Sequence, residues 1–279
     1  MKEKIHIRQS VKQWLENGTV DIFLGYRDVE GHAVPHGFTL ADLDEVESMA
    51  ASESRYALEK LAAKIHERHP DKIIGMIARD CTQRALNVLS IWNQLDAGKI
   101  KTITVNCCPS QLKDHAACSY LEPEKAGTGK KQFGLDPHSD IEEAASAPKH
   151  ERFSRWMYEM QKCIKCYGCR NICPVCFCRE CSLENDDLVH AGMLPPDVPI
   201  FHLVRATHMA GRCIDCGLCE EACPMDIPLR LLYRKVNHIV SEVFDYDTGS
   251  SSDQSPFSVL GDKVTLEPKP IHQDTLEDA

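Results

Sequence analysis

The sequence predicts an α/β domain with a parallel βαβ unit, followed by a mainly α-helical domain. Two short apolar runs, 72–78 and 101–106, flank a helical pattern over residues 81–98. Further along, 11 of the 15 cysteines of this 279-residue chain fall within residues 163–223. An apolar stripe of helical spacing follows these cysteines and starts at Ile227. The strand pattern predicts the first domain, and the cysteine-rich helical pattern predicts the second.

The composition is that of an ordinary globular protein, with 43% hydrophobic and 27% charged residues. A net charge of −10 argues against non-specific nucleic-acid binding and against an anionic membrane surface. The N-terminus has no apolar signal segment, and no apolar run approaches the roughly 20 residues of a membrane helix. We therefore expect a cytoplasmic protein with no direct membrane insertion and no nucleic-acid partner.

The elements of the first domain follow from local patterns along the chain. A helical pattern covers residues 8–16, and alternating polarity over 19–29 predicts a strand. An amphipathic helix is expected over 54–68. The remaining elements are a buried strand over 72–78, a helix over 81–98 that Gly98 closes, and a strand over 101–106. A strand, a helix and a strand in this order are typical of a parallel βαβ unit.

Two copies of one cysteine spacing dominate the second domain. Because a reducing cytoplasm disfavours disulfides, clustered cysteines indicate metal ligation. The pattern C-x2-C-x2-C-x3-C occurs before Pro174 and again before Pro224. In ferredoxins with this spacing, the fourth cysteine ligates the other cluster. The sequence therefore predicts two [4Fe–4S] clusters, the first held by Cys163, Cys166, Cys169 and Cys223, and the second by Cys213, Cys216, Cys219 and Cys173.

Three further cysteines, Cys176, Cys178 and Cys181, directly follow the first motif. They are either buried thiols or spare ligands near the first cluster, or they are ligands of an additional cluster that a cysteine from elsewhere completes. The spacing leaves both interpretations open. A zinc site is disfavoured for the region as a whole, because zinc sites use pairs of cysteines at wider separation.

Four more cysteines fall at the carboxyl ends of the two predicted parallel strands, where ligands bind in such sheets. They are Cys81 after the first strand, then Cys107, Cys108 and Cys118 after the second. We expect them to hold a possible third iron–sulfur cluster. The alternative is that they are ordinary buried cysteines, which are common in protein cores.

The regions between and after the two motifs predict helices. Apolar residues recur near helical spacing over 201–209, and the stripe over 227–243 is expected to be core. Together with the 39 residues between the motifs, this pattern resembles the α-helical ferredoxin domain of heterodisulfide reductase and succinate dehydrogenase iron–sulfur subunits. His202 and His208 are expected to tune a cluster by hydrogen bonding rather than to ligate it.

These patterns divide the chain into four parts. We expect the α/β domain over 1–121 and the α-helical di-cluster ferredoxin domain over 151–244. The polar stretch 122–150 is expected to be a linker or flexible loop. The acidic, proline-bearing tail over 245–279 either wraps a partner or is disordered.

The stretch "IIGMIARDCTQRALNVLSIWNQLDAGKIKTITVNCCP" resembles the core of the deazaflavin-dependent hydrogenase and formate dehydrogenase beta-subunit family. In that family a glycine-containing strand leads to a cysteine, a helix ends in an Asn-Gln pair, and a strand runs to a Cys-Pro turn. The run "CIKCYGCRNICPVCFCREC" is similar to that of the formate dehydrogenase members. The matching residues of the first stretch are Gly75, Cys81, Asn93 with Gln94, and Cys108 with Pro109.

The resemblance covers roughly residues 70–235 and implies a subunit of a soluble oxidoreductase complex. Family members with their own flavin and deazaflavin sites are usually longer than this chain. The sequence has no G-x-G-x-x-G and no P-loop, and "AGTGKK" at 126–131 lacks the required glycine spacing. We therefore expect a shortened, electron-carrying member of the family, and the sequence offers no recognisable FAD site.

The expected function is electron transfer in anaerobic metabolism. The clusters would relay single electrons between a flavoprotein and another iron–sulfur redox subunit, within a hetero-oligomer of the heterodisulfide reductase, formate dehydrogenase or hydrogenase type. No general base, nucleophile or substrate pocket is evident, so no catalytic residue is assigned. The alternatives are a flavin-bearing catalytic beta subunit acting on a deazaflavin or nicotinamide coenzyme, and a zinc-stabilised binding module.

Overall fold

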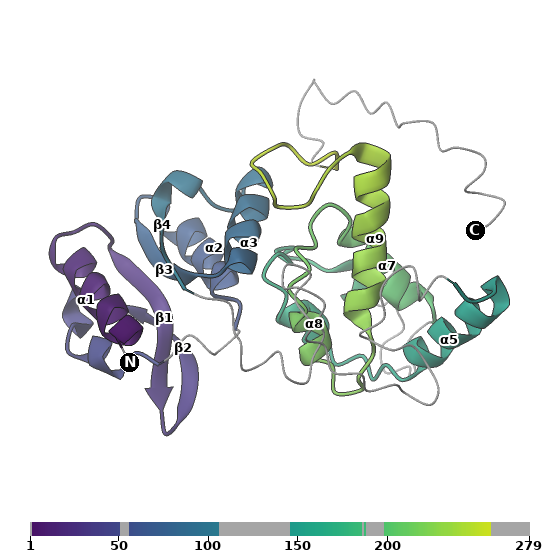
Figure 1. Cartoon of the computed structure of the whole chain (residues 1–279), viewed down its shortest axis with the longest axis horizontal. Coiled ribbons are helices and arrows are strands. Elements are labelled where there is room, and N and C mark those ends of the chain that lie inside the picture. Colours follow the sequence, from purple (N-terminus) through teal and green to yellow (C-terminus); the bar gives the residue numbers. More distant parts are fainter. Residues whose placement is uncertain (1, 51–55, 106–145, 186, 188–197, 258–279) are drawn as a thin grey trace. The chain divides into compact units, whose positions relative to one another are not determined.

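The computed structural model describes residues 2–50, 56–105, 146–185, 187 and 198–257. The chain divides into two compact units, Met1–Gln111 and Leu112–Ala279 (Figure 1). Almost all of the expected linker over 122–150 lies outside the described residues, as does most of the tail after residue 245. The domain boundaries expected from the sequence therefore stay a prediction.

The N-terminal unit is built on a mixed sheet of four strands in the order β2-β1-β3-β4. Strand β1 pairs antiparallel with β2 and parallel with β3, and β3 pairs parallel with β4. Helix α3 (Asp80–Ile91) connects β3 to β4, so the predicted parallel βαβ unit is confirmed. The strands are β1 (Ile22–Val29), β2 (His32–Phe38), β3 (Ile74–Ala78) and β4 (Ile100–Thr104).

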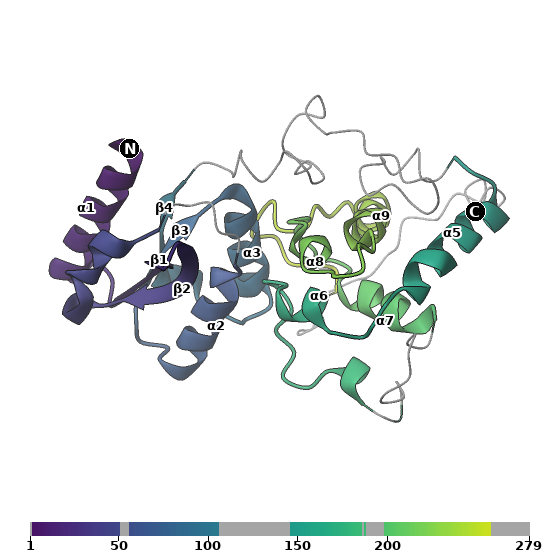
Figure 2. The same ribbon diagram turned by 90° about the horizontal axis from the view of Figure 1, so that it is seen from below.

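Helices cover both faces of this sheet (Figure 2). Alternate residues of a strand point to opposite faces. On one face, Phe23 of β1 makes an edge contact with Trp14 of α1 (Lys2–Glu16). On the other, the hydroxyl of Tyr26 donates to the carbonyl of Tyr56, just before α2 (Leu58–Arg68). The sheet therefore forms a buried middle layer.

Strand β2 was not predicted. It returns from β1 through a two-residue turn at Glu30 and Gly31, with φ values of 53° and 83°. Two positive φ angles give a hairpin the twist that its strands require. The strand itself carries Pro35, and proline is tolerated at a sheet edge. Its weak strand composition hid it from the sequence pattern.

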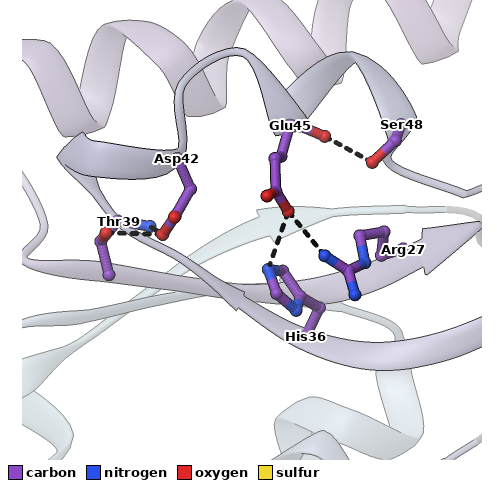
Figure 3. Close-up of polar contacts among 6 residues, drawn as sticks. All are labelled: Arg27, His36, Thr39, Asp42, Glu45 and Ser48. Atoms are coloured by element: carbon purple, nitrogen blue, oxygen red, sulfur yellow. Dashed lines mark hydrogen bonds and ion pairs between the residues drawn. The ribbon is translucent and has the colours of Figure 1, made fainter.

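A polar network joins this hairpin to the segment that follows it (Figure 3). The carboxylate of Glu45 accepts from Arg27 of β1 at 2.7 Å and lies 3.7 Å from Nε2 of His36 of β2. Asp42 accepts from both the backbone and the side chain of Thr39. The Glu45 contacts link the two strands to the short helical turn at Glu45–Ser48, and the Asp42 contacts cap the turn at Leu40–Asp42.

Helix α3 ends earlier than predicted. The expectation that it runs to Gly98 is wrong, because the helix stops at Ile91 and Asn93 adopts a left-handed conformation with φ of 53°. Asparagine is one of the few residues other than glycine that ends helices in this way. The backbone of Gln94 then donates to Leu89, and its side chain donates to Trp92. The Asn-Gln pair is therefore a helix stop.

The C-terminal unit is mainly helical, as predicted, and its described residues contain no strand. The predicted helices are confirmed as α7 and α9, which pack together (Figure 1). The expectation that the stripe over 227–243 is core fails at Ile239, which is 46% exposed. None of the helices in the described residues is long and apolar enough to cross a membrane. The helices are α5 (Lys149–Gln161), α6 (Gly168–Asn171), α7 (Ile200–His208), α8 (Leu218–Glu221) and α9 (Leu229–Phe244).

Candidate metal centre

The two cysteine motifs adopt the same backbone conformation. In each, two left-handed residues precede a short helix: Lys165 and Tyr167 before α6, and Asp215 and Gly217 before α8. The hydrogen bonds repeat as well, since Asn171 donates to Tyr167 as Glu221 does to Gly217. The motifs are therefore a structural repeat as well as a sequence repeat.

The two short helices approach each other closely. A Cβ atom at Gly168, the first residue of α6, would lie only 3.0 Å from the carbonyl oxygen of Ala222, which follows α8. A side chain at this position would push against backbone, so glycine permits the approach. Since Cys223 comes directly after Ala222, this contact places the fourth cysteine of one motif beside the other motif.

The result is two cavities, each lined by four cysteines from both motifs. One cavity, here the first cavity, has walls that include Cys163, Cys166, Cys169 and Cys223. Another cavity, here the second cavity, has walls that include Cys213, Cys216, Cys219 and Cys173. The structure thus brings together both predicted sets of four cysteines, while ligation of iron by these thiols stays a prediction. Among the described residues, no three His, Cys, Asp or Glu side chains converge tightly enough to hold a single metal ion.

Burial shapes the chemistry of these thiols. It raises the pKa of Cys163 to about 11 and that of Cys213 to about 12, and it raises the pKa of Cys219 well above its ordinary value. The thiolate, not the thiol, is the metal ligand. Metal binding in either cavity therefore displaces protons, and the charge of the metal makes that displacement favourable.

Buried polar atoms without partners also face the cavities. Among the described residues, neither ring nitrogen of His202 has a hydrogen-bond partner, although the residue is 2% exposed and lines the first cavity. In the second cavity the same holds for the hydroxyl of Tyr233 and for Nε of Arg205. Buried polar groups normally have partners. An iron–sulfur cluster fits both sites, because its thiolates and sulfides would accept hydrogen bonds from these donors.

His202 has a defined protonation state in this setting. Burial, together with the nearby charge of Arg205, lowers the pKa of His202 to about 4. The ring is therefore neutral at neutral pH and has one N–H to donate. The role expected for His202 from the sequence, a hydrogen-bond donor that tunes a cluster, stays a prediction. His208, the last residue of α7, is exposed and lines neither of the two cavities described here.

A buried ion pair stands at the wall of the second cavity. Arg230 donates from Nε to Asp215 at 2.7 Å and from Nη2 to the second carboxylate oxygen at 3.2 Å. Only 4% of the Arg230 side chain and 12% of the Asp215 side chain are exposed. Because Asp215 lies between two cysteines of the motif, the pair fixes the ligand loop to α9.

The three cysteines after the first motif lie apart from the cavity walls and near arginines. Nη1 of Arg205 lies 3.9 Å from the sulfur of Cys176, and Nη1 of Arg212 lies 3.8 Å from that of Cys178. Cys181 interacts with Arg170. None of the three cysteines, all of them in the described part of the chain, lines either cavity. Their role as additional ligands stays a prediction.

The candidate third cluster cannot be assembled from the described residues. Cys81 lies at the start of α3, directly after the carboxyl end of β3, as expected. Its three proposed partners, Cys107, Cys108 and Cys118, lie outside the described residues.

Sequence reasoning missed Arg205, Arg230 and Tyr233. A signal for Arg205 was present, because it is the one basic residue other than histidine in the apolar stretch "IFHLVRATHMA". A charge that interrupts an apolar helix face is rarely buried without a partner. Tyr233 and Arg230 lie three residues apart on α9, but nothing in their spacing indicates a cavity.

The paired cavities and their cysteines define a class, iron–sulfur proteins, and comparison with known proteins agrees. The family model described as a 4Fe-4S binding domain matches residues 206–228, so the chain carries such a domain.

The more specific likeness is to beta subunits of one enzyme. The chain is 41% identical over 108 residues to the F420-dependent formate dehydrogenase subunit beta of Methanocaldococcus jannaschii. It is 44% identical over 108 residues to the F420-dependent formate dehydrogenase 1 subunit beta of Methanococcus maripaludis. Each match covers 39% of this chain and 28% of the relative, little more than a quarter of its length. The resemblance predicted from the sequence is confirmed over this part of the chain.

Proposed function

We propose that this chain is an electron-transfer subunit of an oxidoreductase complex and that it holds two [4Fe–4S] clusters. One observation carries the proposal: each cavity is lined by three cysteines of one motif and by the fourth cysteine of the other. This exchange is the ligand pattern of two-cluster ferredoxins. A single zinc ion or a disulfide would not need it.

The proposed ligands are the thiolates of the two sets of four. In the first cavity, Phe201 and Ile227 exclude water, and His202 supplies a hydrogen-bond donor. In the second, Tyr233 and Arg205 supply donors. A bound [4Fe–4S] cluster takes up and releases one electron at a time. The chain sets where the electron resides through ligation, hydrogen bonding and exclusion of water.

A subunit of a hetero-oligomer is the setting that the relatives favour, since both are named as subunits of a formate dehydrogenase. The thiol of Cys166 in the first cavity is exposed, which leaves one edge of that site accessible to a redox partner. We propose a flavoprotein and a further iron–sulfur subunit as the partners. Relay between them requires no catalytic residue in this chain.

The test is to measure iron, acid-labile sulfide and flavin per chain in one anaerobically purified sample. About eight irons with matching sulfide and no flavin are expected from two clusters. About twelve irons would add the third cluster near Cys81, and its loss in Cys81→Ser would locate it there. Stoichiometric flavin would favour the catalytic beta subunit instead. Zinc without iron would reject the proposal.

A further inference from the structure

Arg205 of α7 lies between the two cavities. Its Nη2 donates to the backbone carbonyl of Cys169, a residue of the first cavity, at 2.8 Å. Its side chain lines the second cavity, and its Nε has no hydrogen-bond partner in the part of the chain that the structure describes. The residue is only 4% exposed. One buried guanidinium therefore contacts the walls of both sites.

The charge of Arg205 is not neutralised by a carboxylate. Within the described residues no acidic side chain pairs with it, and its neighbours include the ring of Tyr233 at 5.9 Å and the sulfur of Cys176 at 3.9 Å. Arg230 is just as buried in the second cavity, but Asp215 compensates its charge. An arginine stays protonated even when buried. An uncompensated buried cation needs an anionic partner.

We infer that Arg205 is the shared counter-charge of the two proposed clusters, a positioning residue that raises the reduction potential of both. This inference rests on the proposed function. Each cluster with four thiolate ligands is an anion, and one further electron increases its negative charge. A fixed positive charge nearby stabilises the reduced form more than the oxidised form, so the potential rises. Low exposure strengthens this interaction, because little water screens it.

The experiment is an anaerobic titration with dithionite, followed by electron paramagnetic resonance, on the full-length chain with its clusters. In Arg205→Met, which removes the charge but keeps an unbranched side chain, both midpoint potentials are expected to fall. The expected change is at least tenfold in the equilibrium for reduction, or about 59 mV for a one-electron couple. Arg205→Lys keeps the charge and is expected to recover most of the shift. Arg179→Met, at an exposed arginine that lines neither cavity, is the matched control and should leave both potentials unchanged.

Several outcomes would overturn the inference. They are unchanged potentials in Arg205→Met, a shift at one cluster alone, or a shift in Arg205→Lys as large as in Arg205→Met. If Arg205→Met loses its iron, the Arg205→Lys variant decides between the two roles. Wild-type potentials in Arg205→Lys would support the role of the charge. Loss of iron in Arg205→Lys as well would overturn it and assign Arg205 to holding the Cys169 carbonyl. A wild-type chain without clusters would reject the proposed function. A chain that holds eight irons but whose potentials do not respond to Arg205→Met would reject this inference alone and leave the proposed function standing.

Discussion

In the N-terminal unit the large apolar side chains pack against one another, whereas in the C-terminal unit several of them line a cavity together with cysteines. Tyr26, Phe23, Phe38 and Met76 are completely buried within the sheet layers. The largest fully buried residues of the C-terminal unit are Phe201, Ile227, Leu229, His202 and Glu159, and all but Glu159 line the first cavity. The core of the first unit consists of its own side chains, whereas the second unit surrounds its proposed cofactor.

The largest expected effect is therefore the removal of iron. An anaerobic chelator should abolish amide hydrogen-exchange protection in α7 and α9, because a unit organised around a metal centre folds only with it. Protection in β1 and β3 should persist, since their core needs no cofactor. Peptide-resolved hydrogen exchange measures both units in one full-length sample. Equal loss of hydrogen-exchange protection in the two units, or persistence of protection in both, would contradict the proposed difference between them.

The next effect concerns single ligands. Cys169→Ser and Cys223→Ser should damage the same cluster despite their distance in sequence, while Cys173→Ser should damage the other. Each variant is expected to lose up to about four of eight irons. Iron analysis and electron paramagnetic resonance measure the loss. Cys178→Ser, at an exposed thiol outside both cavities, is the control and should keep all the iron. Iron loss that groups Cys169 with Cys173 would show the crossed sets to be wrong.

A smaller effect is expected from the buried ion pair at the second cavity. Asp215→Asn removes the carboxylate charge that pairs with the buried guanidinium of Arg230, which should destabilise the C-terminal unit by about 3–5 kcal/mol. Urea unfolding of the cluster-loaded chain, read by hydrogen exchange in α9, measures it. The control is Glu151→Gln on α5, which breaks an exposed pair with Arg155 and should cost at most about 0.5 kcal/mol. Equal effects of the two substitutions would show that burial of the pair adds nothing.

The smallest effect falls on the N-terminal unit. A Cβ atom at Gly75 would lie 2.6 Å from Cδ2 of Phe23 and 3.1 Å from Cγ1 of Val20. Gly75→Ala should therefore cost about 1–3 kcal/mol through overpacking. Gly25→Ala on β1, where the nearest atom would be 3.5 Å away, is the matched control. Urea titration read at β3 amides measures both. Iron content should not change in either variant, and a loss of iron in Gly75→Ala would mean that the two units are not independent.

Local patterns predicted those parts of the molecule that local sequence determines. The βαβ unit is formed by short apolar strands with a helix between them. Strands and helices each have their own pattern of apolar residues along the sequence. The end of α3 was misplaced because Asn93 stops the helix by its backbone conformation, which no apolar pattern records. Strand β2 escaped because its pairing depends on the turn at Glu30 and Gly31, while Pro35 obscures it.

The candidate site shows the same division. Cysteine spacing alone predicted which thiols share a cavity, because the first three cysteines of each motif lie close together in the sequence. The cysteine spacing did not predict the residues that lie between the two cavities. Arg205 and Tyr233 come from two helices, and only the packing of α7 on α9 brings them together. A helical stripe indicates that a face is buried but not what lies against it.

The exchange of cysteines between the motifs also constrains the order in which a ribosome can finish the protein. The N-terminal sheet is complete once β4 has emerged, and it can fold while synthesis continues. The first cavity has to wait, because its wall includes Cys223 from the far end of the second motif. Until Cys223 has been synthesised, the seven thiols of the first cysteine-rich run are present in the nascent chain without a complete site. The cell therefore has to protect these thiols from oxygen and stray metals throughout that interval.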